Sequence, residues 1–319
     1  MEWQQIIGFY NIVKLGSFTR ASEALFRTQP ALSLQIKSLE NELGCQLFER
    51  IGKRGIKITL AGEILFQYCV KTLDQQKQFM DELNKIKGSI LGHVTMAAPF
   101  FSLYYFLLPP LEMFKQQFPK IEITILDRPA HSIIKLIRDG DIEFGVSMES
   151  IVPKDLTIFP WKKIEGLLIM PKGHSLSKIK NISLKDIINY PLILPPKGYI
   201  ARMRLEEKFE KEGINYRIAM ESSNIDLTIN FVKRGFGIGF AIVSRNLPVL
   251  HEKGIGIIPI NHLIQEDRAA IIIRKDKVLA SYEKAFLQII LAFAKLSRGK
   301  SIHRSKGSYS LPLDQTFPT

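Results

Sequence analysis

Five residues between positions 29 and 37 share one face of a predicted helix, opposite an apolar stripe that recurs at helical spacing. Glutamine can form two hydrogen bonds with adenine, and serine can bond to either kind of base. A helix in the major groove reads bases mainly with the residues of its first turns. These types at this spacing therefore predict contact with the base edges of DNA. The five residues are Gln29, Pro30, Ser33, Gln35 and Lys37.

A second group of residues is suited to hold DNA without reading its sequence. Cationic side chains bind phosphate oxygens and fix the position of a reading helix. Between Ile51 and Leu60 no acidic residue balances the basic ones. The simpler alternative is a helical pair whose polar face only contacts water. Thr28 opens the helix, and the candidate phosphate contacts are Arg20, Arg27, Arg50, Lys53, Arg54 and Lys57.

Three helices and a hairpin must position these groups. Apolar residues at helical spacing from Trp3 predict a first helix, and Ser17 is a suitable N-cap for the second. The third helix begins near Thr28 and ends at Gly44, a typical C-cap glycine. Leu47–Thr59 predicts two short strands around a basic turn. Together these elements predict a winged helix-turn-helix.

The segment from Ala61 to Lys87 predicts one long helix, since it lacks proline and its single glycine lies at the start. Six positions step by three and four residues, as in the seam of a coiled coil. We favour a dimerising helix over a single surface helix. Gln76 either fixes the register of that dimer or is solvated. The seam is Phe66, Cys69, Leu73, Gln76, Met80 and Leu83.

From Val94 onward, strands and helices alternate at a spacing that predicts parallel βαβ units. We expect two α/β lobes joined by a double crossover, with a helix over 102–118, a strand over 167–170 and a ligand cleft between the lobes. Ser102 and Ser222–Asn224 stand at predicted helix N-termini, where an anion is favoured. The alternative is that they are plain N-caps. Phe100 and Phe101 make the first loop apolar.

Composition limits the class of protein. The 319 residues include 44 basic and 31 acidic ones, a net charge of +13 that favours polyanionic partners. Cys45 and Cys69 read as free thiols, and the six histidines lack metal-ligand spacing. No nucleophile, acid or base set is visible, and neither is a signal peptide or a membrane span. We expect a cytoplasmic protein that is not an enzyme, has no cofactor or metal, and contacts no membrane.

Several motifs resemble the LysR-type transcriptional regulators. The matching segments include Gly16-Ser-Phe-Thr-Arg-Ala21, Gln29-Pro-Ala-Leu-Ser33, Leu47-Phe-Glu-Arg50 and Gly235-Phe-Gly-Ile-Gly239. The resemblance extends to about Leu296. Ser22 and Leu34 depart from it, the wing is about a residue longer, and the basic tail after Arg298 has no counterpart.

The resemblance implies an α/β protein whose effector domain is similar to periplasmic binding proteins, assembled as a homotetramer from two dimers. Its partners would be double-stranded operator DNA, a small-molecule effector, other copies of itself and RNA polymerase. The positions that match the effector site of the family are Pro99, Phe100, Phe101, Ser102, Val146, Ser147, Met148, Tyr199, Ile200, Ala201, Ser222, Ser223 and Asn224.

The sequence thus predicts a DNA-binding regulator that responds to a small, anionic effector. Two alternatives are a ligand-independent regulator whose pocket Phe100 and Phe101 close, and a solute-binding or enzymatic module fused to a DNA-binding domain. The predicted parts are a winged helix-turn-helix (1–60), a linker helix (61–88), an effector domain (89–298) with lobe I (89–163 and 267–298) and lobe II (164–266), and a disordered basic tail (299–319).

Overall fold

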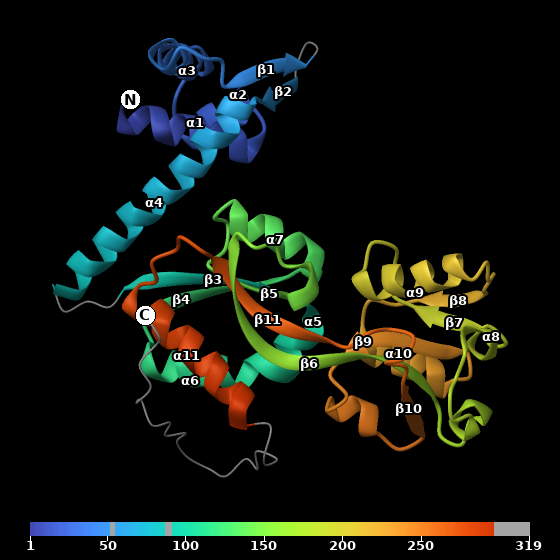
Figure 1. Cartoon of the computed structure of the whole chain (residues 1–319). Coiled ribbons are helices and arrows are strands. Elements are labelled where there is room, and N and C mark those ends of the chain that lie inside the picture. Colours follow the sequence, from blue (N-terminus) through green and yellow to red (C-terminus); the bar gives the residue numbers. More distant parts are fainter. Residues whose placement is uncertain (52–54, 87–90, 297–319) are drawn as a thin grey trace. The chain divides into compact units, whose positions relative to one another are not determined.

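The computed structural model describes residues 1–51, 55–86 and 91–296, with the backbone alone at residues 50, 51, 55, 85, 295 and 296. The chain divides into two compact units (Figure 1). The first is Met1–Ser89 with Asp276–Ala280, and the second is Ile90–Lys275 with Ser281–Thr319. The predicted tail lies outside the described residues.

The first unit contains the predicted three helices, hairpin and long helix. Ser17 caps the second helix by accepting a hydrogen bond from the Arg20 N–H, and Thr28 caps the third in the same way from Ala31. Gly44 ends the third helix with a φ of 67°, as a C-cap glycine does. The elements are α1 (Trp3–Leu15), α2 (Phe18–Ala24), α3 (Gln29–Leu43), β1 (Phe48–Ile51), β2 (Gly55–Ile58) and α4 (Leu60–Ile86).

The start of α4 belongs to the core of the first unit. Phe66 and Cys69 are buried with the inward residues of α1 and α3, and the Phe66 ring stacks on Tyr10 at 5.6 Å. Gln76 and Met80, further along the predicted seam, are exposed. Two positions of the predicted seam, Phe66 and Cys69, therefore pack in the core of the unit itself. The sequence did not show this, because apolar spacing alone does not distinguish a core from a dimer interface.

Three residues fasten the hairpin to the helices. The Glu40 carboxylate accepts hydrogen bonds from the N–H groups of Leu47 (2.7 Å) and Phe48 (3.4 Å). The Thr59 hydroxyl donates to the Gln46 carbonyl at 2.7 Å and accepts from the Gly62 N–H at 3.0 Å. A Cβ at Gly62 would lie 2.4 Å from the Leu47 carbonyl oxygen, so this close approach requires glycine.

A nine-stranded sheet runs through the second unit in the order β4-β3-β5-β11-β6-β9-β7-β8, with β10 beside β6. The expectation of parallel units holds for part of it: β3 pairs in parallel with β4 and β5, and β7 with β8 and β9. The pairs of β6 and β11 are antiparallel, so the sheet is mixed. The strands are β3 (Gly92–Ala98), β4 (Ile121–Asp127), β5 (Phe144–Met148), β6 (Leu156–Pro171), β7 (Leu192–Leu194), β8 (Ile218–Glu221), β9 (Ile238–Val243), β10 (Ile255–Pro259) and β11 (Asp267–Arg274).

One strand passes through both lobes of the second unit. β6 pairs with β11 over Leu156–Ile164 and then with β9 over Glu165–Ile169 (Figure 1). The predicted strand over 167–170 was therefore too short, because Pro160 and Lys162–Lys163 interrupt the apolar run. A β-bulge in the β6–β11 pairing falls at this interruption. The lobes thus share a continuous backbone at the crossover.

Helices cover both faces of the first lobe. Phe144 of β5 contacts Phe286 at 5.2 Å, whereas a Cβ at the next residue, Gly145, would meet Ile133. Successive strand residues point to opposite faces, so the helices that carry Phe286 and Ile133 lie on opposite faces of the sheet. Helices of the second unit include α7 (Ala130–Arg138), α8 (Leu184–Ile187), α9 (Ile200–Lys211), α10 (Ile225–Lys233) and α11 (Ser281–Leu296).

The helix predicted over 102–118 begins earlier and is irregular. It consists of α5 (Phe100–Ser102), a π-helical turn (Leu103–Leu107) and α6 (Leu108–Gln117). Pro109 and Pro110 lack the N–H groups that would bond to the carbonyls four residues before them. The wider turn directly precedes these prolines, and such turns are frequent at functional sites.

Candidate functional site

The face of α3 that is predicted to read bases is open to solvent. Gln29, Pro30 and Lys37 are exposed, and Ser33 is half-buried. The Gln29 side-chain amide donates a hydrogen bond to the Ser33 hydroxyl at 3.1 Å. These side chains hold each other in place on the first turns of the helix, in reach of an incoming partner.

Gln35 lies beside the buried stripe rather than opposite it, which corrects its predicted place on the helix. Its amide oxygen accepts a hydrogen bond from Arg27 at 2.9 Å, and Arg27 also donates to Gln4 at 2.7 Å. The angular step of the helix carries position 35 toward α1, since a Cβ at Gly8 would lie 3.3 Å from Gln35. Gln35 and Arg27 are thus engaged within the unit.

The other predicted DNA contacts are only partly described. Arg20 is exposed and donates to the Leu15 carbonyl, while the Thr28 hydroxyl serves as the N-cap of α3. The side chain of Arg50 and the whole of Lys53 and Arg54 lie outside the described residues.

Two exposed apolar side chains near the reading face were not predicted as site residues. Phe26, in the turn between α2 and α3, is 98% exposed and has a φ of 53°, and Leu34 is 69% exposed. Leu34 was noted as a departure from the family pattern. Nothing in the local sequence marks Phe26, because its exposure follows from the turn geometry.

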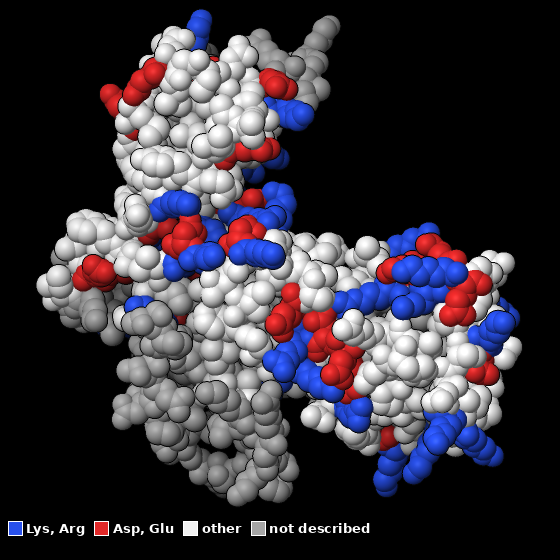
Figure 2. All heavy atoms as spheres, in the orientation of Figure 1, with Lys and Arg blue, Asp and Glu red and all other residues white. Residues whose placement is uncertain are grey.

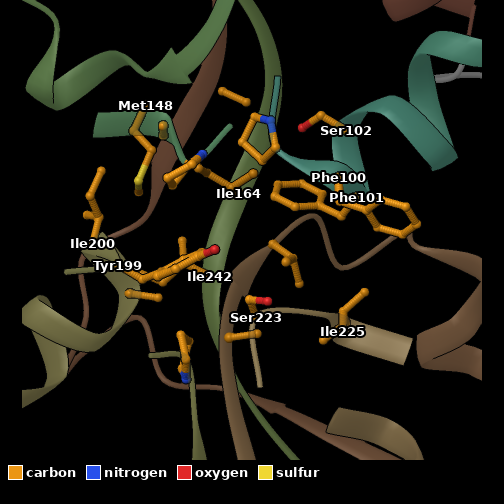
Figure 3. A pocket seen from close by; sticks show the side chains of 18 of the residues that line it. Phe100, Phe101, Ser102, Met148, Ile164, Tyr199, Ile200, Ser223, Ile225 and Ile242 are labelled. Atoms are coloured by element: carbon orange, nitrogen blue, oxygen red, sulfur yellow. The ribbon is translucent and has the colours of Figure 1, made fainter. Parts of the chain in front are cut away.

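The second unit holds a cavity of about 240 Å³ between its lobes (Figure 3). The strand order brings the ends of β3, β5, β7 and β8 to the same place, so all thirteen residues predicted for the effector site line this cavity. They include Phe100 and Phe101 from the first lobe and Tyr199 from the second. Whether they bind a ligand remains a prediction.

A loop missed by the sequence analysis completes the pocket wall. Asp127–His131 spans the end of β4, the turn after it and the start of α7, and further lining residues are Ile164 of β6, Ile242 of β9 and Ala269 of β11. The sequence could have predicted that the residues after β4 line the pocket, because the carboxyl ends of the neighbouring parallel strands β3 and β4 meet at one edge of the sheet.

Ser102 is the buried polar residue of the pocket that stands out. It is 1% exposed, and its hydroxyl has no hydrogen-bond partner among the described residues. The prediction that it begins a helix was wrong: Pro99 is the N-cap, and Ser102 lies in the first turn. In Figure 3 its oxygen is turned away from the helix ribbon.

Asn224, at the other predicted helix N-terminus, is an N-cap. Its side-chain oxygen accepts hydrogen bonds from the N–H groups of Asp226 (2.8 Å) and Leu227 (3.1 Å). Ser222 is bonded to the Asn224 backbone through both its donor and its acceptor. The structure therefore separates the two ends: the N-cap interpretation fits Asn224 and does not fit Ser102.

The rings of Phe100 and Phe101 line the pocket without filling it. Phe100 stacks on Tyr104 at 5.7 Å, and Phe101 packs against the apolar cluster of the second lobe. Neighbouring contacts hold each ring at the wall, and this leaves the cavity open.

Two polar bridges join the lobes near the pocket. The Tyr105 hydroxyl donates to the Asp226 carboxylate, and burial followed by this bond raises the pKa of Tyr105. Arg204 donates to Asp267 at 2.7 Å, and Ser150 bonds to both. Burial alone would raise the pKa of Asp267, but the hydrogen bonds from Ser150 and Arg204 outweigh it and lower that pKa. The bridges favour the observed arrangement of the lobes.

Neither metal-binding groups nor surface charge point to a further site in the described parts of the chain. Over the described ranges, no group of three His, Cys, Asp or Glu residues could hold a metal ion. Figure 2 shows basic and acidic side chains intermingled on the visible face of the second unit. In the described parts of the chain, no helix is long and apolar enough to cross a membrane. Net charge therefore identifies no interface by itself.

The fold and the two sites define a winged helix-turn-helix protein with a two-lobed ligand-binding domain. The pattern of the LysR substrate binding domain matches residues 87–295, and that of the bacterial regulatory helix-turn-helix protein, lysR family, matches residues 3–63. Since the first match alone covers more than half of the chain, the protein belongs to the LysR family of transcriptional regulators.

Similar proteins agree with this assignment. The regulator CysB of Burkholderia cenocepacia is 25% identical over 275 residues, covering 86% of this chain and 88% of its own. The uncharacterized regulator YybE of Bacillus subtilis is 30% identical over 242 residues, covering 75% and 81%. Full-length LysG from Corynebacterium glutamicum, solved with bound effector Arg, is 18% identical, covers 93% of this chain and 99% of its own, and has a TM-score of 0.67. At that identity the likeness shows the fold alone.

Proposed function

We propose that this protein regulates transcription by binding a specific operator and by responding to a small, anionic molecule between the lobes of its second unit. The observation that carries the proposal is the pocket: thirteen residues from separate segments line one cavity in a chain that also has a winged helix-turn-helix. A pocket of this kind is the default place for a ligand.

Base reading falls to Gln29, Pro30, Ser33 and Lys37 in this proposal. Duplex DNA offers stronger partners than the Gln29–Ser33 hydrogen bond, so binding exchanges that bond for contacts with base edges. Gln35 and Arg27 join if their bond opens. Arg20, Thr28 and the wing residues Arg50, Lys53 and Arg54 contact phosphates, which adds affinity but no sequence preference.

The effector acts by preferring one arrangement of the lobes. A ligand shifts such an equilibrium only if it binds the two arrangements unequally. The bridges Tyr105–Asp226 and Arg204–Asp267 hold the observed arrangement, so a ligand in the adjacent pocket strengthens or weakens them. The lobes then transmit the change to the spacing of the DNA-binding units.

Self-association completes the proposed mechanism. Met80 of the predicted seam is 47% exposed on α4, as expected for a position that contacts a second copy. We propose a dimer through α4 and a homotetramer made of two dimers, acting in the cytoplasm, with RNA polymerase as a further partner. The relatives are named as regulators, and we propose no enzymatic activity and no cofactor for this chain.

Selection from a pool of random duplex DNA tests the proposal. The full-length protein should enrich one sequence motif, and gel-shift titration should then show tighter binding to that motif than to scrambled DNA. Affinity should fall with salt, since phosphate contacts release counterions. Enrichment of no motif would contradict sequence-specific binding.

A further inference from the structure

The helix α3 carries an apolar side chain in the middle of its outward face. Leu34 is 69% exposed, although it lies among the polar residues predicted to read bases. A helix turns about 100° per residue, which places Leu34 about 140–160° around the axis from the three buried residues of α3. Leu34 therefore points away from the core, toward any partner that α3 contacts. The buried residues are Leu32, Ile36 and Leu39.

The charges on α3 leave this face open to a polyanion. The two carboxylates of the helix are those of Glu40 and Glu42, both in its second half. Glu40 accepts hydrogen bonds from the hairpin, and Glu42 accepts one from the N-terminal amine. Lys37 is exposed within about 60° of Leu34 on the same face. This border fits duplex DNA, whose phosphates attract the cation while its base edges meet the leucine.

Short neighbours allow Leu34 to reach a base edge. Pro30 and Ser38 stand one turn before and one turn after it, and both are exposed. Neither side chain is longer than that of leucine, so neither keeps the helix away from the groove. Leu34 also lies in the second turn of α3, and a helix in the major groove reads bases mainly with its first turns. Leu34 is therefore placed where a base can be read.

Thymine is the base that offers a methyl group in the major groove. The other bases are distinguished there by their hydrogen-bond donors and acceptors. The leucine side chain has no hydrogen-bonding group, so a donor or acceptor covered by it would lose its bond to water without a replacement. Contact with a methyl group instead removes two apolar surfaces from water. At the position that it faces, Leu34 should therefore favour thymine over the other bases.

We propose that Leu34 selects a thymine in each half of the operator by packing against its C5-methyl group. The inference rests on the proposed function and deepens it, because it names a base and the group of that base which the recognition helix reads. In a dimer the two copies of α3 read the same base at symmetric positions, so the selected motif contains this thymine twice.

Removal of single methyl groups from the DNA tests the proposal. The full-length protein first selects its motif from random duplex DNA, and each thymine of that motif is then replaced by deoxyuridine. This change removes the methyl group and keeps the base pair. We expect one thymine in each half-site at which the replacement weakens binding about 3- to 10-fold, as for the burial of one methyl group. A motif in which no replacement weakens binding would overturn the proposal.

A pair of leucine variants assigns the methyl contact to Leu34. Leu34→Ala should bind the thymine and deoxyuridine forms of that position with equal affinity. Leu43→Ala is the matched control and should keep the preference for thymine, because Leu43 is exposed on the same helix about 180° around the axis from Leu34. A Leu34→Ala protein that melted as the unaltered protein does and still preferred thymine would refute the assignment.

A methyl group on a different base gives an independent measurement with the unaltered protein. At the position found with deoxyuridine, the thymine–adenine pair is replaced by a cytosine–guanine pair, with or without a C5-methyl group on the cytosine. The methylated DNA should bind more tightly than the unmethylated DNA by a similar factor. Equal affinities would show that the deoxyuridine effect comes from the shape of the DNA and would overturn the contact.

The selection step separates this inference from the proposed function. If the protein selects a motif but tolerates deoxyuridine at every thymine, the role of Leu34 is wrong and the proposed function stands. If it selects no motif, sequence-specific binding itself fails, and the role of Leu34 fails with it.

Discussion

The reading face of α3 and the pocket of the second unit present polar groups in opposite ways. On α3 the polar side chains are exposed or half-buried, and the exposed Gln29 is hydrogen-bonded to the half-buried Ser33. In the pocket, Ser102 is buried and unbonded among the described residues. Water can replace a lost partner on α3, but no partner is at hand for Ser102. Changes on α3 and removal of the unbonded Ser102 hydroxyl should therefore cost little stability, whereas loss of a bonded polar group at the pocket, such as Asn224, should lower it.

The largest expected effect tests the exposed side of this comparison. Replacing both Gln29 and Ser33 with Ala should reduce the preference for selected over scrambled DNA about 10- to 100-fold, since a good base contact contributes about 1–3 kcal/mol of discrimination. The melting temperature should change little because Gln29 is exposed, Ser33 is only half-buried, and neither belongs to the apolar core. Gel-shift titration against both DNAs measures the preference.

Lys57→Ala is the matched control for that double variant. A phosphate contact should weaken binding to both DNAs alike and flatten the salt dependence. A double variant that kept its full preference would show that bases are read elsewhere.

The next largest effect is expected at Gly62, where the start of α4 packs closely against the chain that leads into the hairpin. Gly62→Ala places a Cβ 2.4 Å from the Leu47 carbonyl and 2.6 Å from Ile58, which should destabilise the first unit by about 1–3 kcal/mol. Urea denaturation measures the loss. Gly256→Ala is the control, because its Cβ would meet nothing closer than 3.7 Å, and an equal loss there would remove the steric explanation.

Asn224→Ala should have a smaller effect, which sharpens the contrast between the two ends at the pocket. Loss of this N-cap should lower stability by about 1 kcal/mol, and Asn224→Asp should retain most of it. Ser102→Ala removes an unbonded hydroxyl and should cost little or nothing in stability. The denaturation midpoint should be lowest for Asn224→Ala, higher for Asn224→Asp and highest for Ser102→Ala. A larger loss of stability in Ser102→Ala than in Asn224→Ala would contradict the contrast.

Acid should weaken the second unit through carboxyls that folding stabilises in their charged form. Hydrogen bonds from Arg245 lower the pKa of Glu165, and those from Ser150 and Arg204 lower that of Asp267. A lowered folded pKa stabilises fully above the unfolded value of about 4 and is lost as pH falls through the folded value. Stability should be flat in this respect from pH 5 to 8 and fall below about pH 4, less so in Glu165→Gln.

The smallest expected effect concerns the thiols of the first unit. Cys45 is exposed and should react with a disulfide reagent at pH 8. Burial raises the pKa of Cys69 to about 12, so its thiolate is roughly one part in 10,000 at that pH and should stay unmodified. Reaction of both thiols in the folded protein would show that the α4 core opens.

Regular elements were predictable because their signals are local, and the pocket lining was predictable because it follows a family pattern. The apolar stripes predicted α3 and α11, and the family pattern predicted the thirteen residues that line the pocket. Three features were not predictable in that way. Pro160 and the lysines after it concealed half of β6, the helix predicted from Ser102 begins at Phe100 and contains a π-helical turn, and Phe66 and Cys69 could serve either a core or a partner helix.

The N-terminal part of α4 shares a core with α1 and α3, so a tilt of α4 should also move these two helices. Because Phe66 and Cys69 are buried with α1 and α3, the first turns of α4 cannot swing without carrying the recognition helix with them. The other arm is long, since the part of α4 from Val70 to Ile86 spans about 25 Å, and a tilt of about 5° moves the far end by about 2 Å. A small displacement applied there would thus rotate the face of α3 that we propose reads DNA.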